Sequence, residues 1–185
     1  MGIYERGIKT MIGDMTLRAS LNGLISIQFK ESNKNDSLNI FDITEQQLNE
    51  FFKLERESFQ IKLDLNGTQF QKKCWNYLMT ISYGQVRSYK EQGIAVGGEN
   101  YARAVAQANN KNPLPIIIPC HRVIGSNGKL VGYAGGLEIK ERLLKIEKKK
   151  GAEGEREYFG TVHTREREKI LISICLCNFK LNAYY

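Results

Sequence analysis

A cysteine that follows a proline and precedes two basic residues is the feature of this sequence best suited to chemistry. Cys120 stands between Pro119 and the pair His121–Arg122, and all three prolines of the 185-residue chain fall within residues 112–123. Proline fixes φ and removes a donor, so this segment is neither a regular helix nor a central strand. A free cysteine is most often a small core residue, but a neighbouring imidazole or guanidinium favours the reactive thiolate. The pattern therefore indicates a nucleophilic thiol on a rigid, buried segment.

The base that would activate this thiol, and the group that would orient the base, are less directly specified. Neighbouring residues of an extended segment point to opposite faces, so we expect His121 to reach Cys120 through a water or a bend. A base usually has an orienting partner, and Glu147 lies on the apolar side of a helix predicted at residues 138–150. The same carboxylate also fits the solvated Glu-Lys-Lys-Lys end of that helix, and spacing alone does not decide between the two.

The elements that must position these residues divide the chain in two. We expect an α+β unit over residues 1–65, with its boundary at Asn66-Gly67-Thr68. Its predicted elements are strands at 15–20 and 24–29 joined by the turn Leu21-Asn22-Gly23, a helix at 44–52 with Thr44 as N-cap, and a strand at 59–65.

The second unit, residues 66–150, carries a helix-turn-helix pattern. A helix with apolar residues from Phe70 to Ile81 ends at Tyr83-Gly84. A capping box at Ser88 and Glu91 starts a short helix that runs to Val96. A glycine turn with Asn100 as the next N-cap precedes a helix at 101–109. The glycine-rich stretch 125–136 allows close backbone approach to a ligand, or is a plain hairpin turn.

Composition narrows the class of protein. The net charge of +7 and the pI of about 9.2 favour a polyanionic partner or an anionic membrane surface. No apolar run approaches the roughly 20 residues that span a bilayer, and no secretion signal is evident, so we expect a cytosolic protein with reduced cysteines. Two histidines do not make a local zinc site of standard spacing. We predict a partly disordered tail over 151–185, and assign no role to it or to Cys175 and Cys177.

The stretch Pro119-Cys120-His121-Arg122-Val123, with Asn112-Pro113 before it and residues 132–137 after it, resembles the methylated-DNA–protein-cysteine methyltransferase family. This family is also called O6-alkylguanine-DNA alkyltransferase. The resemblance is close over 68–149, looser over 1–65 and absent from 151 onward. It implies an α+β fold with a ribonuclease-H-like first domain and a mainly α, winged-helix-like second domain. It also implies irreversible, single-use transfer of the alkyl group from O6-alkylguanine to Cys120 with base flipping, and leaves O4-alkylthymine open as a further substrate.

The resemblance assigns roles to individual residues. The implied catalytic residues are Cys120 as acceptor, His121 as base through a water, Glu147 as its orienting group and Asn112 as the residue that holds the active-site turn. The implied substrate-binding residues are Tyr89, Val123, Tyr133, Ala134 and Lys140, with Lys140 supporting the leaving oxygen. The implied DNA-binding residues are Arg103, Ala102, Ala106, Gln107 and Arg122.

The implied partner is alkylated double-stranded DNA, bound through its minor groove by a monomer. We expect no cofactor and no membrane association, and no structural metal because residues 1–65 show no evident zinc ligands. The expected location is the cytoplasm with the nucleoid, or the nucleus in a eukaryote. Four positions depart from the family pattern. Gly93 lies inside a helix, where glycine costs about 1 kcal/mol. Asn100-Tyr101 stands where Pro-Lys is common, and Asn109 replaces an apolar pocket residue of some members.

Three other functions remain as alternatives on the sequence. A non-catalytic binder of alkylated bases would lack the acceptor cysteine, which this chain has. A helix-turn-helix transcription regulator would use the same two helices but would not explain Pro-Cys-His-Arg. A Cys-His amidase or protease would turn over many times and would ignore DNA.

Overall fold

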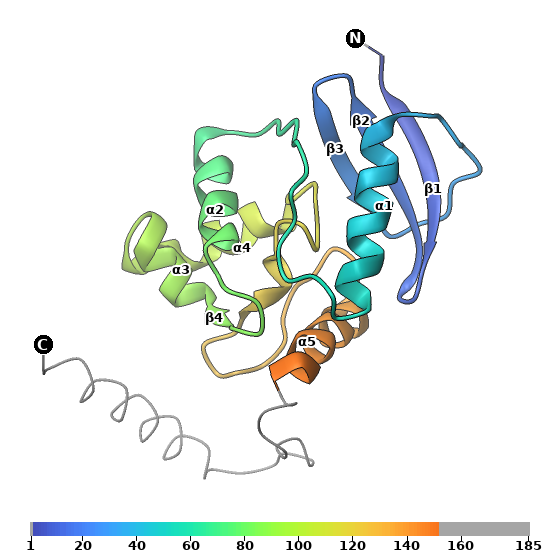
Figure 1. Ribbon diagram of the computed structural model, residues 1–185. Helices are drawn as coiled ribbons and strands as arrows, with labels where there is room; N and C mark the ends of the chain where they lie inside the picture. The colour runs from blue at the N-terminus through green and yellow to red at the C-terminus, as the bar shows by residue number, and fades with distance from the viewer. Residues whose placement is uncertain (1, 152–185) are drawn as a thin grey trace, which may run out of the picture. The chain divides into compact units, whose positions relative to one another are not determined.

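The computed structural model describes residues 2–151, with side chains through Lys148, and these residues belong to one compact unit. An antiparallel sheet opens the chain, in the order β1 (Tyr4–Thr10), β2 (Gly13–Ser20) and β3 (Gly23–Gln28). Helix α1 (Asn39–Phe52) packs along the sheet, as Figure 1 shows, and buries Phe41, Leu48 and Phe51. The predicted tail and its two cysteines lie outside the described residues.

Two predicted elements of this first part are wrong in their details. Helix α1 begins at Asn39, and Thr44 is not an N-cap, because its hydroxyl lies inside the helix and donates to Ile40 O at 2.6 Å. The strand predicted at 59–65 is reduced to one parallel bridge between Leu63 and Leu24. Two segments share the outer edge of β3, because Leu63 pairs with Leu24 while Ile27 N donates to Pro113 O at 2.9 Å. A long strand therefore cannot pair along this edge.

The second part of the unit consists of short helices around a two-stranded parallel pair. Helix α2 (Gln69–Met79) carries a capping box between Thr68 and Gln71, and α3 (Tyr89–Val96) carries the predicted one between Ser88 and Glu91. Strand β4 (Arg87–Ser88) pairs with β5 (Val123–Ile124). The 3-10 turn Glu99–Tyr101 precedes α4 (Ala102–Asn110), and α5 (Leu137–Gly151) follows the glycine-rich loop. Asn100 therefore lies inside the 3-10 turn and does not cap α4.

Gly93 has a packing reason for its place inside α3. A Cβ added to Gly93 would lie 2.9 Å from Ala102 N and 3.2 Å from Tyr101 C. Glycine therefore allows α3 to approach the start of α4 closely, which offsets its low helix propensity. The two helices predicted as a helix-turn-helix pack against each other through this contact.

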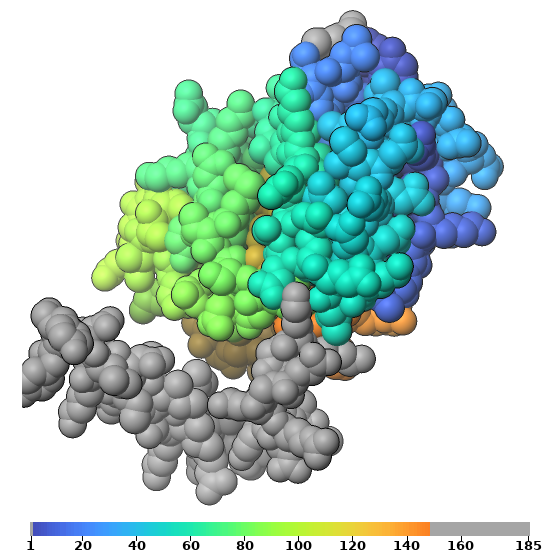
Figure 2. All heavy atoms as spheres, viewed as in Figure 1, coloured from blue at the N-terminus to red at the C-terminus, as the bar shows by residue number. Residues whose placement is uncertain are grey.

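One hydrophobic core joins the sheet to the helices. Met15 and Leu17 of β2 belong to the same cluster as Trp75 of α2, Cys120 and Leu143 of α5. Figure 2 shows the atoms of residues 2–65 adjoining those of the helices that follow. The predicted α+β class is confirmed, while the boundary at residue 65 remains a prediction. Among the described residues no helix has both the length and the apolar character needed to cross a membrane.

Candidate active site

Cys120 lies at the start of a 3-10 turn, not in an extended segment. The turn Cys120–Arg122 follows Pro119, and Cys120 is only 5% exposed. The side chain of Asn112 stabilises it, because Nδ2 donates to Ile118 O at 2.8 Å and to Sγ of Cys120 at 3.1 Å. Ile116, within the same segment, has a φ of 77°. This conformation costs a β-branched residue roughly 1–3 kcal/mol, so the surrounding contacts must impose it.

Burial raises the pKa of the Cys120 thiol to about 11, against the opposing effects of the Asn112 hydrogen bond and the Lys140 charge. Cys120 is therefore a neutral thiol at pH 7, and a base must remove its proton before the sulfur can act as a nucleophile. The nearby basic residues His121 and Arg122 do not ionise the thiol in the resting protein.

The imidazole of His121 lies against a buried carboxylate. Its Nε2 lies 2.7 Å from Oε1 of Glu147, and both side chains are fully buried. Burial is the largest cause that lowers the pKa of His121, and together with the charges of Arg122 and Lys140 it outweighs the opposing effect of Glu147. The imidazole is therefore neutral at pH 7. An ionised carboxylate only accepts hydrogen bonds, so Nε2 carries the hydrogen and Nδ1 keeps a free lone pair.

Nδ1 of His121 is buried and has no hydrogen-bond partner among the described residues. Within the same residues no hydrogen bond joins the imidazole directly to Sγ of Cys120. Proton transfer between them through a relay therefore stays a prediction.

Glu147 is a buried carboxylate with three partners. Besides His121, its oxygens accept from Gly84 N at 3.0 Å and from the Arg122 guanidinium at 2.9–3.1 Å. Burial would raise the pKa of Glu147, but hydrogen bonds and charges from His121 and Arg122 lower it to about 2. Of the two positions that spacing allowed for Glu147, the structure has the buried one.

The prediction that Arg122 binds DNA is corrected by this geometry. Arg122 is 6% exposed, its Nη1 donates to Ile81 O at 2.5 Å, and its remaining contacts go to Glu147. Its guanidinium is thus directed into the protein because residues 120–122 turn. The ion pair between Arg122 and Glu147 was not predicted from the sequence.

A cavity of about 390 Å³ connects the thiol to helix α4. Cys120 lines it together with predicted substrate residues and predicted DNA-binding residues of α4. These are Tyr89, Tyr133 and Ala134 on one side, and Ala102, Arg103, Ala106 and Gln107 on α4. Arg103 and Gln107 are exposed to solvent. A group that enters from the surface of α4 can therefore reach the sulfur.

Lys140 and Val123, predicted to bind the substrate, are not among the residues that line this cavity. The Nζ atom of Lys140 donates to Val123 O at 2.6 Å, Val131 O at 2.7 Å and Gly132 O at 3.3 Å. Burial lowers the pKa of Lys140 to about 8. All three ammonium hydrogens are engaged by carbonyl groups, which does not fit the expected support of a leaving oxygen. Lys140 instead ties the loop at Val131 and Gly132 to strand β5.

A buried pair of amides joins the two helices of the helix-turn-helix. Asn109 Nδ2 donates to Gln92 Oε1 at 2.8 Å, and Gln92 Nε2 donates to Asn109 Oδ1 at 3.2 Å. The side chain of Asn109 also borders the cavity. The sequence marked Asn109 only as a departure from an apolar pattern. Gln92 and Asn109 each lie among the inward-facing positions of their helices. Two amides at such positions on neighbouring helices are a signal that could have predicted the pair, because buried polar groups need hydrogen-bond partners.

The amino-acid sequence is similar to those of known methylated-DNA–protein-cysteine methyltransferases. Residues 69–149 match the family described as 6-O-methylguanine DNA methyltransferase, DNA binding domain. The methylated-DNA–protein-cysteine methyltransferase of Methanosarcina barkeri is 44% identical over 153 residues, which cover 78% of this chain and 97% of that relative. The one from Mycobacterium bovis is 42% identical, with coverages of 79% and 93%.

Solved structures give the same result. The crystal structure of the Mycobacterium tuberculosis O6-methylguanine methyltransferase is similar to this chain with a TM-score of 0.73 and 39% identity, covering 80% of this chain and 94% of that one. A structure of the Mycobacterium tuberculosis protein in complex with DNA gives a TM-score of 0.72 at 41% identity, with the same coverages. This chain is therefore a member of the methylated-DNA–protein-cysteine methyltransferase family.

Proposed function

We propose that this protein repairs alkylated guanine in DNA by moving the O6-alkyl group irreversibly to Sγ of Cys120. The observation that supports this most is the cavity that joins Cys120 to Arg103 and its neighbours on α4. A transcription regulator does not require a thiol at that place, and an amidase does not require a DNA-binding helix beside its nucleophile. The names of the relatives and the DNA complex of the Mycobacterium tuberculosis protein support the same function.

The target oxygen lies inside the stacked duplex, so the nucleotide must rotate out before Cys120 can reach it. Arg103 is exposed on α4, and we propose that its side chain enters the duplex and fills the gap that the extruded guanine leaves. Ala102 and Ala106 have small side chains, which allow α4 to enter the minor groove closely, and Gln107 contacts the strand beside them. Tyr89 and Tyr133 border the cavity that receives the base, and backbone groups of Val123 and Ala134 read its edge.

The chemical step begins with the proton of Cys120. It passes through a water to Nδ1 of His121, and Glu147 stabilises the imidazolium that results. The sulfur attacks the alkyl carbon, so the S–C bond forms as the bond from that carbon to O6 breaks. The electron pair of the broken bond stays on the guanine oxygen, and the proton returns from His121 to the guanine. Cys120 ends as a thioether, which water does not hydrolyse, so each molecule acts once.

The charge balance of the buried cluster fits this sequence of events. Arg122 neutralises Glu147 while His121 is neutral, so the resting cluster carries no net charge. A neutral His121 can accept a proton, and the carboxylate 2.7 Å from Nε2 stabilises the charge that then appears. Asn112 holds Sγ in place before and during the attack.

We further propose that the protein acts as a monomer on one duplex, since the cavity is built from residues 89–134 of a single chain. Residues 66–150 would carry the DNA-binding and acceptor functions, and residues 1–65 would support them. The substrate places the protein where the DNA is, in the cytoplasm with the nucleoid or in a eukaryotic nucleus.

The experiment that tests this function is a titration of repaired DNA. A duplex with one O6-methylguanine is incubated with increasing protein, and restored guanine is counted by nuclease digestion and chromatography. We expect one restored guanine per molecule of protein, and none with Cys120→Ser. Restoration of many guanines per molecule would contradict single-use transfer, and restoration by Cys120→Ser would contradict the acceptor.

A further inference from the structure

An aromatic residue just beyond β3 packs against the loop that forms one wall of the cavity. The ring of Phe29 lies 5.8 Å from the ring of Tyr133, centroid to centroid. A Cβ added to Gly135 would come within 2.6 Å of the Phe29 ring. The ring of Phe29 thus occupies the space that any larger residue at position 135 would need.

The backbone of Phe29 is itself held in place on both sides. Two residues earlier, Ile27 N donates to Pro113 O at 2.9 Å, which ties β3 to the segment that precedes the active-site turn. One residue later, Lys30 O accepts from the hydroxyl of Thr16 at 2.9 Å. Phe29 therefore extends from a fixed backbone and can act as a rigid support for the loop.

The two halves of the loop at residues 131–135 differ in how firmly other residues hold them. The first half is held by Lys140 and Tyr89, whose polar atoms contact the carbonyls of Val131 and Gly132. The second half lies between two cavities, because Ala134 borders both the one of about 390 Å³ and another of about 300 Å³. Phe29 borders the second cavity, and Tyr133 Oη has no hydrogen-bond partner among the described residues.

We propose that Phe29 is a positioning residue for alkyl transfer, which acts by pressing the Tyr133–Gly135 half of the loop against the bound base. The inference rests on the proposed function of Cys120. Without the ring, this half of the loop can move into the adjoining cavity, and the base then loses the wall that holds its alkyl carbon against Sγ. Misplacement of reacting atoms by about 1 Å lowers rates by up to about a hundredfold.

The first test separates positioning from DNA binding. Single-turnover alkyl transfer is measured over a range of duplex concentrations for the wild type, Phe29→Ala and Phe29→Leu. We expect Phe29→Ala to lower the rate constant at saturating duplex by roughly tenfold, while the apparent Kd for the duplex stays within about twofold. Phe29→Leu, which fills most of the space and folds more readily, should recover most of the rate.

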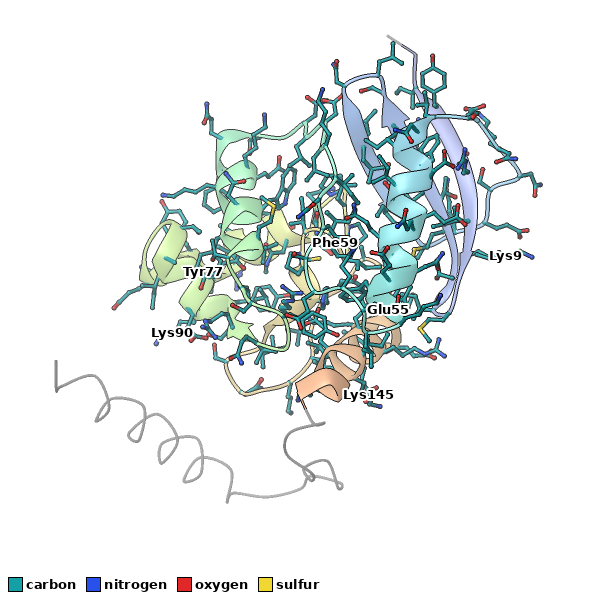
Figure 3. All side chains as sticks on the ribbon, viewed as in Figure 1. Lys9, Glu55, Phe59, Tyr77, Lys90 and Lys145 are labelled. Atoms are coloured by element: carbon teal, nitrogen blue, oxygen red, sulfur yellow. The ribbon has the colours of Figure 1, made fainter. Side chains whose placement is uncertain are left out.

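Phe59 provides a matched control for lost packing. It is a partly buried phenylalanine of the first part of the chain, 5.5 Å from the ring of Phe51, and Figure 3 labels it beside α1. Phe59→Ala should reduce the free energy of unfolding but leave the rate constant of transfer unchanged at a temperature where the variant is folded.

The second test uses the contact with Gly135. Gly135→Ala alone forces its Cβ against the Phe29 ring, so we expect slower transfer. In the Phe29→Ala background the same Cβ enters emptied space, and the double variant should transfer faster than the product of the two single effects predicts. Wild-type rates in Phe29→Ala, or strictly multiplicative effects in the double variant, would overturn the inference. Failure of the wild type itself to alkylate Cys120 would instead reject the proposed function.

Discussion

Replacing Glu147 by glutamine is the perturbation whose effect the geometry specifies best. The carboxylate accepts from three donors: His121, Arg122 and Gly84. An amide has one accepting oxygen and one donating nitrogen, so in any orientation its NH₂ group faces a donor. The change therefore removes a buried ion pair and also creates a clash between donors.

The loss of stability follows from the shifted pKa. Glu147 titrates at a pKa of about 2 in the folded protein, against 4.5 as its ordinary value. A depressed carboxyl pKa contributes stability that is present above pH 4.5 and is lost as the pH falls towards 2. The shift corresponds to about 3 kcal/mol at pH 7. Removing one partner of a buried ion pair costs about 3–5 kcal/mol, which agrees.

The loss of activity follows from the protonation of His121. A neutral amide does not stabilise the imidazolium in either orientation, so His121 becomes a weaker base. When the NH₂ group faces Nε2, the imidazole must also accept there, and Nδ1 then carries the hydrogen and cannot take the proton of Cys120. Losing a general base lowers rates by roughly 10²–10⁴-fold. We expect Glu147→Gln to show both effects.

The assays are urea unfolding between pH 2.5 and 7, and single-turnover transfer at a temperature where the variant is folded. The variant should lack the part of the acid-dependent loss of stability between pH 4.5 and 2 that Glu147 contributes in the wild type. Glu141→Gln is the matched control, because Glu141 is exposed on the same helix and pairs with Lys145 at 2.8 Å. Such a pair is worth about 0.3–0.5 kcal/mol. Wild-type transfer by folded Glu147→Gln would refute the role given to this carboxylate.

Three further predictions concern α4, the thiol and the buried amides. Arg103→Ala should slow transfer from duplex DNA and reduce the salt dependence of binding, with little effect on transfer from free O6-methylguanine base; equal losses on both substrates would contradict the assignment. Because burial raises the pKa of Cys120 to about 11, iodoacetamide should modify Cys120 of the folded protein slowly at pH 8, and fast modification there would contradict a neutral resting thiol. Asn109→Leu leaves the buried amide of Gln92 without its partner and should reduce the free energy of unfolding by about 1–3 kcal/mol; the additional change Gln92→Leu should restore part of it, as chemical denaturation can measure.

Local signals in the sequence predicted local structure well. The capping box at Ser88 and Glu91 was correct because both of its hydrogen bonds close within four residues. The predicted N-cap at Thr44 was misleading, because the helix begins at Asn39 and already includes the apolar residues Ile40 and Phe41. Strand β1 was missed because only Ile8 in it is buried, and its strand character arises from pairing with β2.

The site shows the same division between local and distant causes. Cys120 and His121 could be identified from their neighbours in the sequence. The direction of Arg122 could not, because it depends on a 3-10 turn that Asn112 stabilises from eight residues before Cys120. Phe29 gave no signal, since its contact with Gly135 joins residues more than 100 positions apart.

The most direct test of the central claim is intact mass spectrometry, followed by peptide mapping, after incubation with a duplex that carries one O6-methylguanine. We expect a gain of one CH₂ unit per molecule, located at Cys120 and absent from Cys120→Ser. Cys74→Ser is the control, because Cys74 is fully buried in α2 and does not line the cavity. An unchanged mass while the methylguanine-containing duplex stays bound, or a methyl group on any other cysteine, would contradict alkyl transfer to Cys120.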